Sequence, residues 1–337
     1  MEQATPPDAI VQGLHRMGLT AEGASVTGAP LAGGVSSDIW RIDLARGPIC
    51  VKRALPKLRV AADWYAPVDR NLFEARWMRR AGAAAPGAVP ALLGQDPETG
   101  TLAMEFLAPG QHPNWKLVLR DGVAEPEFAA TVGKTLARIH AATAADPTTA
   151  RCFPTDAIFN AIRLEPYLIA TARVHPDRAD ALLALAERTQ NTKRAMVHGD
   201  VSPKNILVGP AGPVFLDAEC AWWGDPAFDL AFCLNHLLLK CLWKPAARAG
   251  FLRCFESLSG AYLKGVNWEP PADIEQRTAT LLPGLMLARV DGKSPVEYLT
   301  DAGDKTKVRR FARALLLQQL PSLPALCRAW GRNLSRE

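Results

Sequence analysis

Three polar residues near the middle of the chain have the types and the spacing that phosphoryl transfer requires. Asp200 lies in the segment HGDVSPKN, Asn205 follows it by five residues, and Asp217 ends the apolar segment PVFLD. Phosphoryl transfer requires a carboxylate that orients and deprotonates the attacking hydroxyl. It also requires oxygen ligands, such as an amide oxygen and a second carboxylate, that hold Mg²⁺ on the phosphates. The three residues therefore match the catalytic set of a phosphoryl-transfer site.

The segments around these residues predict a loop that leads into a β-hairpin. The apolar runs NILV and PVFLD flank a Gly-Pro turn, which is typical of two paired strands. Asp200 and Asn205 would converge at the start of this hairpin, and the second strand would bring Asp217 beside them. The alternative is that three polar side chains gather by chance at one strand-bounded loop, and the spacing disfavours it.

The chain divides into a strand-rich part and a helix-rich part, as expected for 337 residues, which exceed the usual size of a single core. Residues 40–51 predict a hairpin, residues 71–82 have helical periodicity, and a second hairpin is expected around the turn at residues 97–100. Long helical patterns dominate the remainder. We therefore expect an N-lobe of residues 1–107 and a C-lobe of residues 108–337.

The segment HGDVSPKN, followed by FLDAE, resembles the catalytic loop and metal-binding segment of the aminoglycoside phosphotransferase and choline kinase-like superfamily. The resemblance implies an α+β, two-lobed protein-kinase-like fold with ATP in the cleft between the lobes. It further implies that Asp200 is the catalytic base and that Asn205 and Asp217 bind Mg²⁺. Asp217-Ala218-Glu219 replaces the Asp-Phe-Gly of protein kinases and no Ala-Pro-Glu segment follows, so a Ser/Thr protein kinase is disfavoured.

Other motifs of the superfamily follow in the expected order. LAGGVSSDIW resembles the loop that covers the phosphates, Lys52 resembles the lysine that holds the α- and β-phosphates, and Glu74 resembles its ion-pair partner. AMEFL resembles the hinge that meets adenine, and Lys204 is a candidate for the γ-phosphate, although a solvated lysine is nearly as plausible there. The expected nucleotide-binding residues are Gly33, Gly34, Ser36, Ser37, Lys52, Glu74, Met104, Glu105, Phe106, Leu107 and Lys204.

Further residues are expected to support the loop or to meet the acceptor. His198 more often fixes such a loop by hydrogen bonds than transfers protons. In GDPAFDLAF, Asp225 and Asp229 are the candidates for bracing the catalytic loop. The candidates for substrate contacts are Trp222, Arg289 and Asp291. Trp222 could instead be a core residue, and the Arg289 and Asp291 pair could instead form a salt bridge or cap at a helix end.

Composition limits the compartment and the partners. The formal charge of +5 is too small and too scattered to indicate a nucleic-acid partner. The seven cysteines are odd in number and lack CxxC spacing, so we expect reduced thiols. The N-terminal segment lacks the pattern of a secretory signal, and the apolar stretch at residues 230–243 is interrupted by polar residues. We expect a cytoplasmic protein that acts on a small molecule without a membrane partner.

The acceptor is the least defined part of the hypothesis, because one fold serves many alcohols. Residues 235–337 hold 16 Lys and Arg against nine Asp and Glu, and a polycationic aminoglycoside would prefer an acidic pocket. We expect ATP-dependent phosphorylation of a neutral or anionic polyol or sugar-like hydroxyl compound. The alternatives are an aminoglycoside-type antibiotic phosphotransferase and a nucleotide-binding pseudokinase. The sequence leaves open the acceptor's identity, the use of GTP and the oligomeric state.

Overall fold

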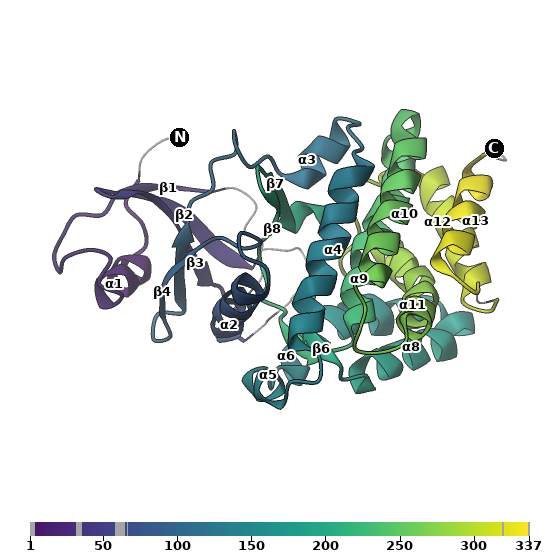
Figure 1. Cartoon of the computed structure of the whole chain (residues 1–337), viewed down its shortest axis with the longest axis horizontal. Helices are drawn as coiled ribbons and strands as arrows, with labels where there is room; N and C mark the ends of the chain where they lie inside the picture. Colours follow the sequence, from purple (N-terminus) through teal and green to yellow (C-terminus); the bar gives the residue numbers. More distant parts are fainter. Residues whose placement is uncertain (1–3, 32–35, 58–64, 66, 319, 336–337) are drawn as a thin grey trace.

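A computed structural model describes residues 4–31, 36–57, 65, 67–318 and 320–335. It has the expected α+β architecture, with a β-sheet lobe beside a larger helical lobe (Figure 1). The sheet ends at Glu105 and the next helix begins at Trp115, so the proposed boundary after residue 107 falls in the connection between them. None of the helices in the described residues is long and apolar enough to cross a membrane.

The N-terminal sheet is antiparallel, with the strand order β1-β2-β3-β5-β4. Both predicted hairpins, β2-β3 and β4-β5, are confirmed. The elements of this lobe are α1 (Asp8–Arg16), β1 (Gly28–Pro30), β2 (Ser37–Leu44), β3 (Gly47–Ala54), α2 (Arg70–Ala84), β4 (Leu92–Asp96) and β5 (Thr101–Glu105).

Strand alternation decides which side chains of the sheet meet the rest of the molecule. Val51 and Ala103 pack with α1 in a small apolar cluster on one face. Leu102 and Met104 belong to the large core that includes α2. Because successive side chains of a strand point to opposite faces, Lys52 lies on the face opposite Val51, toward α2. The sheet thereby presents one lysine to the interior of the molecule.

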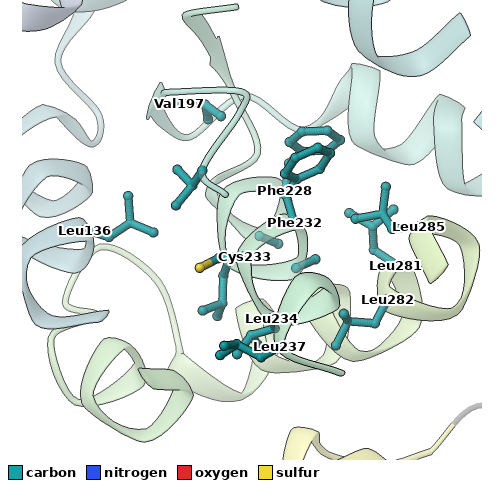
Figure 2. Packing of buried hydrophobic residues seen from close by; sticks show 14 of the residues in the cluster. Leu136, Val197, Phe228, Phe232, Cys233, Leu234, Leu237, Leu281, Leu282 and Leu285 are labelled. Carbon is teal, nitrogen blue, oxygen red and sulfur yellow. The ribbon is translucent and has the colours of Figure 1, made fainter. Parts of the chain in front are cut away.

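The helical lobe is built around α9, whose side chains are almost all buried. A helix that is apolar around its whole circumference belongs in a core. Figure 2 shows Phe228, Phe232 and Leu234 of α9 among the buried residues, with Leu281 and Leu285 of α11. The helices here are α3 (Trp115–Arg120), α4 (Pro126–Thr143), α5 (Pro147–Cys152), α6 (Asp156–Phe159), η1 (Asn160–Ile169), α7 (Ala170–Val174), η2 (Pro176–Arg178), α8 (Ala179–Asn191), η3 (Pro203–Asn205), α9 (Pro226–Trp243), η4 (Pro245–Ala247), α10 (Arg248–Lys264), α11 (Pro271–Asp291), α12 (Ala302–Leu315) and α13 (Leu323–Ser335).

Two short antiparallel pairs flank the segment that carries Asp200 and Asn205. β6 (Ala195–Val197) pairs with β9 (Trp222–Gly224), and β7 (Ile206–Gly209) pairs with β8 (Gly212–Phe215). The second pair confirms the hairpin predicted from NILV and PVFLD. Residues 198–205 connect β6 to β7, so the strands fix both ends of the segment that carries Asp200 and Asn205.

The helical stretch from α6 to α7 contains a long π-helical segment, η1. Pro166 lies inside it, where it lacks the N–H that an α-helix would use, and the wider turn continues the helix past the proline. Such segments frequently occur at functional sites. Here η1 carries Arg163 and Tyr167 toward the loop of Asp200.

Candidate active site

The loop that carries Asp200 is held by Asp229 of α9. The carboxylate of Asp229 accepts hydrogen bonds from the backbone N–H groups of His198 (2.7 Å) and Gly199 (2.8 Å). Gly199 has a φ of +79°, and a Cβ there would lie 2.5 Å from the carbonyl oxygen of Cys220. A glycine is therefore required at this turn, and the buried carboxylate fixes the backbone just before Asp200.

Asp225, the other candidate for bracing the loop, has a different role. Its side chain accepts from the N–H of Ala227 (3.0 Å) and caps the first turn of α9. It also pairs with Arg277, with 3.0 Å between Nε and Oδ2. Of the two candidates, only Asp229 accepts hydrogen bonds from the loop of Asp200 within the described residues.

His198 bonds to the backbone on both sides of the site. Its Nδ1 accepts from the N–H of Asp200 (3.1 Å), so Nε2 carries the proton and donates to the carbonyl oxygen of Leu216 (3.0 Å). Burial lowers the pKa of His198, which favours this neutral form. Through these two hydrogen bonds, His198 joins the loop of Asp200 to the backbone just before Asp217 and supports both.

The Asp200 carboxylate lies between two cationic side chains. Oδ2 is 2.9 Å from Nη2 of Arg163 and 3.4 Å from Nζ of Lys204. Arg163 also donates to the carbonyl oxygen of Gly199, so one buried guanidinium holds both the loop and the carboxylate. Asn205 donates from Nδ2 to the carbonyl oxygen of Asp200 (3.1 Å). The sequence analysis missed Arg163, because an arginine in a helical segment usually reads as a surface residue.

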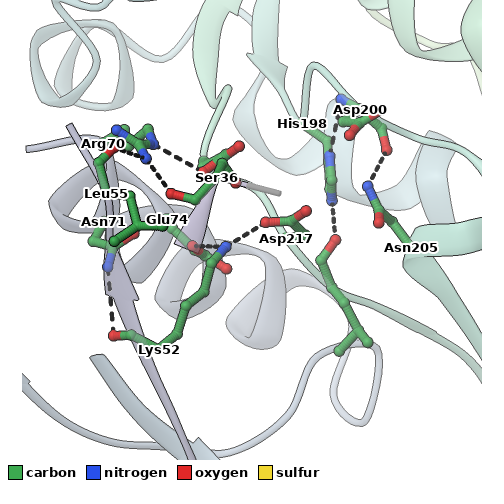
Figure 3. Close-up of polar contacts among 12 residues, drawn as sticks. Ser36, Lys52, Leu55, Arg70, Asn71, Glu74, His198, Asp200, Asn205 and Asp217 are labelled. Carbon is green, nitrogen blue, oxygen red and sulfur yellow. Dashed lines mark hydrogen bonds and ion pairs between the residues drawn. The ribbon is translucent and has the colours of Figure 1, made fainter. Parts of the chain in front are cut away.

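Lys52 contacts two carboxylates, one from each lobe. Nζ of Lys52 is 2.7 Å from Oε2 of Glu74 on α2, and it also contacts Oδ1 of Asp217 at the end of β8 (Figure 3). Burial alone would lower the pKa of Lys52, but the charges of Asp217 and Glu74 raise it well above its usual value. Burial raises the pKa of Glu74 to about 7. One lysine thus contacts two carboxylates.

The backbone at Asp217 is strained. Its φ of +66° lies in the left-handed region that non-glycine residues rarely adopt. Although burial opposes it, the charges of Lys52 and Lys204 lower the pKa of this carboxyl below its usual value. The strain and the charged surroundings are features that cluster at functional sites.

Arg70 is a second residue that the sequence analysis missed. It is fully buried at the start of α2 and donates to the backbone carbonyl oxygens of Leu55 (2.7 Å), Pro67 (2.7 Å) and Ser36. Its Nε also donates to Oε2 of Glu219 (2.9 Å), two residues after Asp217. Arg70 therefore ties the segment expected to cover the phosphates to the segment expected to bind the metal.

The remaining nucleotide-site predictions lie around β2 and β5. Ser36 and Ser37 are buried at the start of β2, whereas Gly33 and Gly34 lie outside the described residues. Met104 and Glu105 end β5, and the pairing of β5 with β3 stops at Glu105. Phe106 and Leu107 follow this end, so their backbone is outside the sheet ladder, as a hinge that meets adenine requires.

The three candidates for substrate contacts have different surroundings. Trp222 is a core residue, in contrast to its predicted place beside the substrate: its ring stacks on Phe159 with centroids 4.0 Å apart. Asp291 pairs with Arg309 (2.7 Å) and His175 (2.9 Å), which is the alternative of a salt bridge at a helix end. Arg289 instead faces η1, as described below.

The chain is similar to phosphotransferases and small-molecule kinases. The model of the phosphotransferase enzyme family (APH) matches residues 27–260. A methylthioribose kinase of Pectobacterium atrosepticum is 25% identical over 276 residues, which are 73% of this chain and 68% of the relative. A methylthioribose kinase of Cronobacter sakazakii is 27% identical over 273 residues, 72% of this chain and 67% of the relative.

Solved structures share the fold at low sequence identity. A choline/ethanolamine kinase family protein of Mesorhizobium loti has a TM-score of 0.53 at 16% identity, and the match covers 95% of this chain and 98% of that one. An ethanolamine kinase of Plasmodium vivax has a TM-score of 0.55 at 11% identity, covering 96% and 84%. An amicoumacin kinase in complex with AMP-PNP, Ca²⁺ and Ami has a TM-score of 0.53 at 14% identity, covering 90% and 91%. These matches confirm the two-lobed kinase-like fold.

Proposed function

The chain belongs to the phosphotransferase enzyme family, and we propose that it transfers the γ-phosphoryl group of ATP to a hydroxyl of a small, sugar-like acceptor. The observation that carries the proposal is the ion-paired set of Lys52 and Glu74, both buried, with the partly exposed Asp217, beside the loop of Asp200. The methylthioribose kinases among its relatives support the sugar-like acceptor. We further propose a cytoplasmic location, because the reaction uses ATP and all seven cysteines are unpaired thiols.

Asp200 acts as the catalytic base in this proposal. The acceptor hydroxyl gives its proton to the Asp200 carboxylate, its oxygen forms the new bond to phosphorus, and the bond from phosphorus to the leaving oxygen of ADP breaks. Arg163, at 2.9 Å, holds the carboxylate in one orientation. General base catalysis of this kind contributes about 10²- to 10⁴-fold to the rate. Lys204, at 3.4 Å from Asp200, is available to the transferred phosphoryl group.

Lys52 is the proposed ligand of the α- and β-phosphates. In the structure its ammonium bridges Glu74 and Asp217. Glu74 keeps the lysine in position from α2, while the phosphates replace Asp217 as its second anionic partner. Ser36 and Ser37 belong to the loop proposed to cover the phosphates, together with Gly33 and Gly34, and the backbone after β5 receives adenine.

Asn205 and Asp217 are the proposed ligands of Mg²⁺, and their surroundings fit this ion. Both supply oxygen, which Mg²⁺ prefers. Because the Asn205 nitrogen donates to a backbone carbonyl, its amide oxygen is left for a metal. The side chain of Asp217 is 28% exposed. When bound, Mg²⁺ neutralises charge on the β- and γ-phosphates. The described residues hold no group of three or more His, Cys, Asp or Glu side chains suited to a metal, and Mg²⁺ in kinases usually takes one or two carboxylates plus substrate phosphates.

The test is acceptor-dependent release of ADP by the purified chain. The panel contains methylthioribose, sugars, sugar acids, choline and kanamycin, each with ATP and Mg²⁺, and Asp200→Asn is the matched inactive control. We expect turnover with at least one sugar-like acceptor and its loss in the control. ATP binding without turnover on any compound would indicate a pseudokinase. Turnover with kanamycin alone would show that the acceptor is an aminoglycoside and not a sugar-like compound.

A further inference from the structure

Two buried cations near the active site have no carboxylate partner. They are Lys240, on the last turn of α9, and Arg289, near the end of α11. We call them, together with His236, the basic cluster. The salt bridges of the described residues include neither Lys240 nor Arg289, although neighbouring cations such as Arg277 and Lys293 each pair with a carboxylate. The contrast indicates that the basic cluster is built for something other than an internal ion pair.

Lys240 is the more unusual of the two cations. It is 1% exposed, and its Nζ has no hydrogen-bond partner among the described residues. The ammonium lies 4.4 Å from the ring centre of Trp243 and 4.5 Å from that of Tyr298. These rings stabilise a cation only in part, and a buried charge without a counterion is costly. Burial accordingly lowers the pKa of Lys240 to about 7, so it keeps its charge more readily when an anion is present.

Arg289 also lacks a carboxylate partner, although some of its N–H groups donate to neutral acceptors. Its Nη1 donates to the hydroxyls of Tyr167 (3.1 Å) and Ser294 (2.9 Å) and to the carbonyl oxygen of Ser294, all of which are neutral, and its buried Nε has no partner among the described residues. A guanidinium has five N–H donors in a planar fork that suits a carboxylate or a phosphate. The donors left over at Arg289 therefore match an anionic group that the described chain does not itself supply.

The basic cluster is connected to Asp200 by two aromatic rings. Arg163, the partner of Asp200, lies 5.8 Å from the ring centre of Tyr167, and Arg289 lies 5.5 Å from the same ring. The two guanidinium carbons are therefore at most about 11 Å apart. A small molecule can span that distance with a hydroxyl at Asp200 and a charged group at Arg289.

The second connection runs along one face of α9. Phe232, His236 and Lys240 follow each other at intervals of four residues, so they lie on the same side of the helix. Arg163 lies 5.7 Å from the ring centre of Phe232, whose ring is 5.6 Å from that of His236. Along the helix axis, Phe232 and Lys240 are about 12 Å apart. A lysine side chain on a helix leans back toward the N-terminus, which is the direction of Phe232.

The charges around His236 belong to the same region. Burial lowers the pKa of His236 well below its usual value, and Arg289, Lys240, Lys204 and Lys116 lower it further. Lys204 is the residue 3.4 Å from Asp200, which ties this field to the catalytic loop. Lys116 of α3 is paired with Glu297, and among the described residues that carboxylate is the acidic charge that acts on Lys240. Four cations thus act on His236, between the catalytic loop and Lys240.

We propose that the phosphate acceptor carries an anionic group, a carboxylate or a phosphate, that binds between Lys240 and Arg289 while its hydroxyl lies at Asp200. This inference rests on the proposed kinase function and narrows its substrate class to sugar acids or sugar phosphates. These two cations also disfavour choline and aminoglycosides, because a cationic acceptor would have to displace or face the buried ammonium of Lys240.

The test uses pairs of compounds that differ only in the anionic group. The pairs are gluconate with glucitol and ribose 5-phosphate with ribose, which also separate a carboxylate from a phosphate. We expect the preferred anionic compound to have a KM at least about tenfold lower than its neutral partner, since one charge-assisted contact is worth roughly that factor. Lys240→Met should remove this advantage, with kcat and the KM for ATP unchanged. Lys293→Met, which removes an exposed lysine paired with Glu165, is the matched control and should change neither KM.

Binding measurements keep the inference testable if turnover fails. Calorimetric titration of each compound into the chain with AMP-PNP and Mg²⁺ reports affinity without catalysis, and thermal unfolding of Lys240→Met verifies that the variant is folded. Arg289→Gln serves as a second variant. It should weaken the binding of the anionic compounds and leave the binding of the neutral compounds unchanged. The inference is overturned if both neutral compounds bind as tightly as their anionic partners, or if neither variant weakens anion binding. Absence of turnover together with selective anion binding would instead count against the kinase function alone.

Discussion

Asp229→Asn tests whether the catalytic loop depends on one buried carboxylate. In the native structure that carboxylate accepts from the N–H groups of His198 (2.7 Å) and Gly199 (2.8 Å), and its Oδ2 is 3.2 Å from Nε2 of His140. An asparagine has the same shape but a single acceptor oxygen, so one backbone N–H would face the new NH₂ group. A buried donor without a partner costs about 1–3 kcal/mol, and bonds to a charged acceptor are worth about 1.5–3 kcal/mol.

These magnitudes predict a loss of about 2–4 kcal/mol in the free energy of unfolding. The effect on catalysis follows from position, because Asp200 comes directly after Gly199 and displacement of a catalytic group by about 1 Å can lower a rate 10²-fold. We therefore expect kcat to fall about 10²-fold in the fraction that remains folded. Urea unfolding measures the first quantity, and ADP release under conditions where the variant is folded measures the second.

Asp225→Asn is the matched control, four residues earlier on the chain. It keeps an N-cap, because asparagine accepts from the N–H of Ala227 as aspartate does, but it loses the ion pair with Arg277, so its stability should fall by about 1–3 kcal/mol. It has no contact with the catalytic loop among the described residues, so kcat should stay within about threefold of the native value. If Asp225→Asn lowers kcat as much as Asp229→Asn, or if Asp229→Asn keeps native kcat, the bracing role assigned to Asp229 is wrong.

Three further outcomes are expected. Asp200→Asn should lower kcat at least about 10²-fold with ATP binding retained by calorimetry, and a variant above a tenth of native kcat would remove Asp200 from the base role. Activity should require Mg²⁺ or Mn²⁺, and Asp217→Ala should abolish it, whereas turnover in excess EDTA would contradict the metal assignment. Because the pKa of Lys240 is about 7, the KM for an anionic acceptor should rise as the pH increases from 7 to 9: the amine loses its proton, and binding must then restore it. The KM should not change with pH for a neutral acceptor, and it should not change with pH in Lys240→Met.

Much of the fold could be predicted because its signals are local. The two N-terminal hairpins and the hairpin after the catalytic loop are each encoded by alternating apolar residues around a turn of a few residues. Strand alternation also places Lys52 on the face toward Glu74, although the two are 22 residues apart in the chain. The order of the motifs along the sequence was thus enough to predict which residues form the candidate site, without knowledge of the long-range contacts.

The residues that the sequence did not reveal act through distant partners. Arg70 pairs with Glu219, which is 149 residues away, and Arg163 reaches Asp200 from a segment whose Pro166 predicts a helix break. The wide turn of η1 continues past that proline, and periodicity calculated for an α-helix does not describe it. The prediction for Trp222 was wrong for a related reason: in β9 its side chain and that of Trp223 point to opposite faces, and the core lies on the side of Trp222.

The polar residues of α9 show how one buried helix joins the two halves of the proposed site. In the sequence, polar residues in this apolar stretch argue only against a membrane span. In the structure, Asp229 near the start of the helix holds the loop of Asp200, while Lys240 near its end supplies an unpaired buried cation. A rise of 1.5 Å per residue separates these two positions by about 16 Å. Because a helix packed on all sides cannot shift one end without the other, α9 sets the distance from the proposed base to the proposed anion subsite. That rigidity would let the site select acceptors by length as well as by charge.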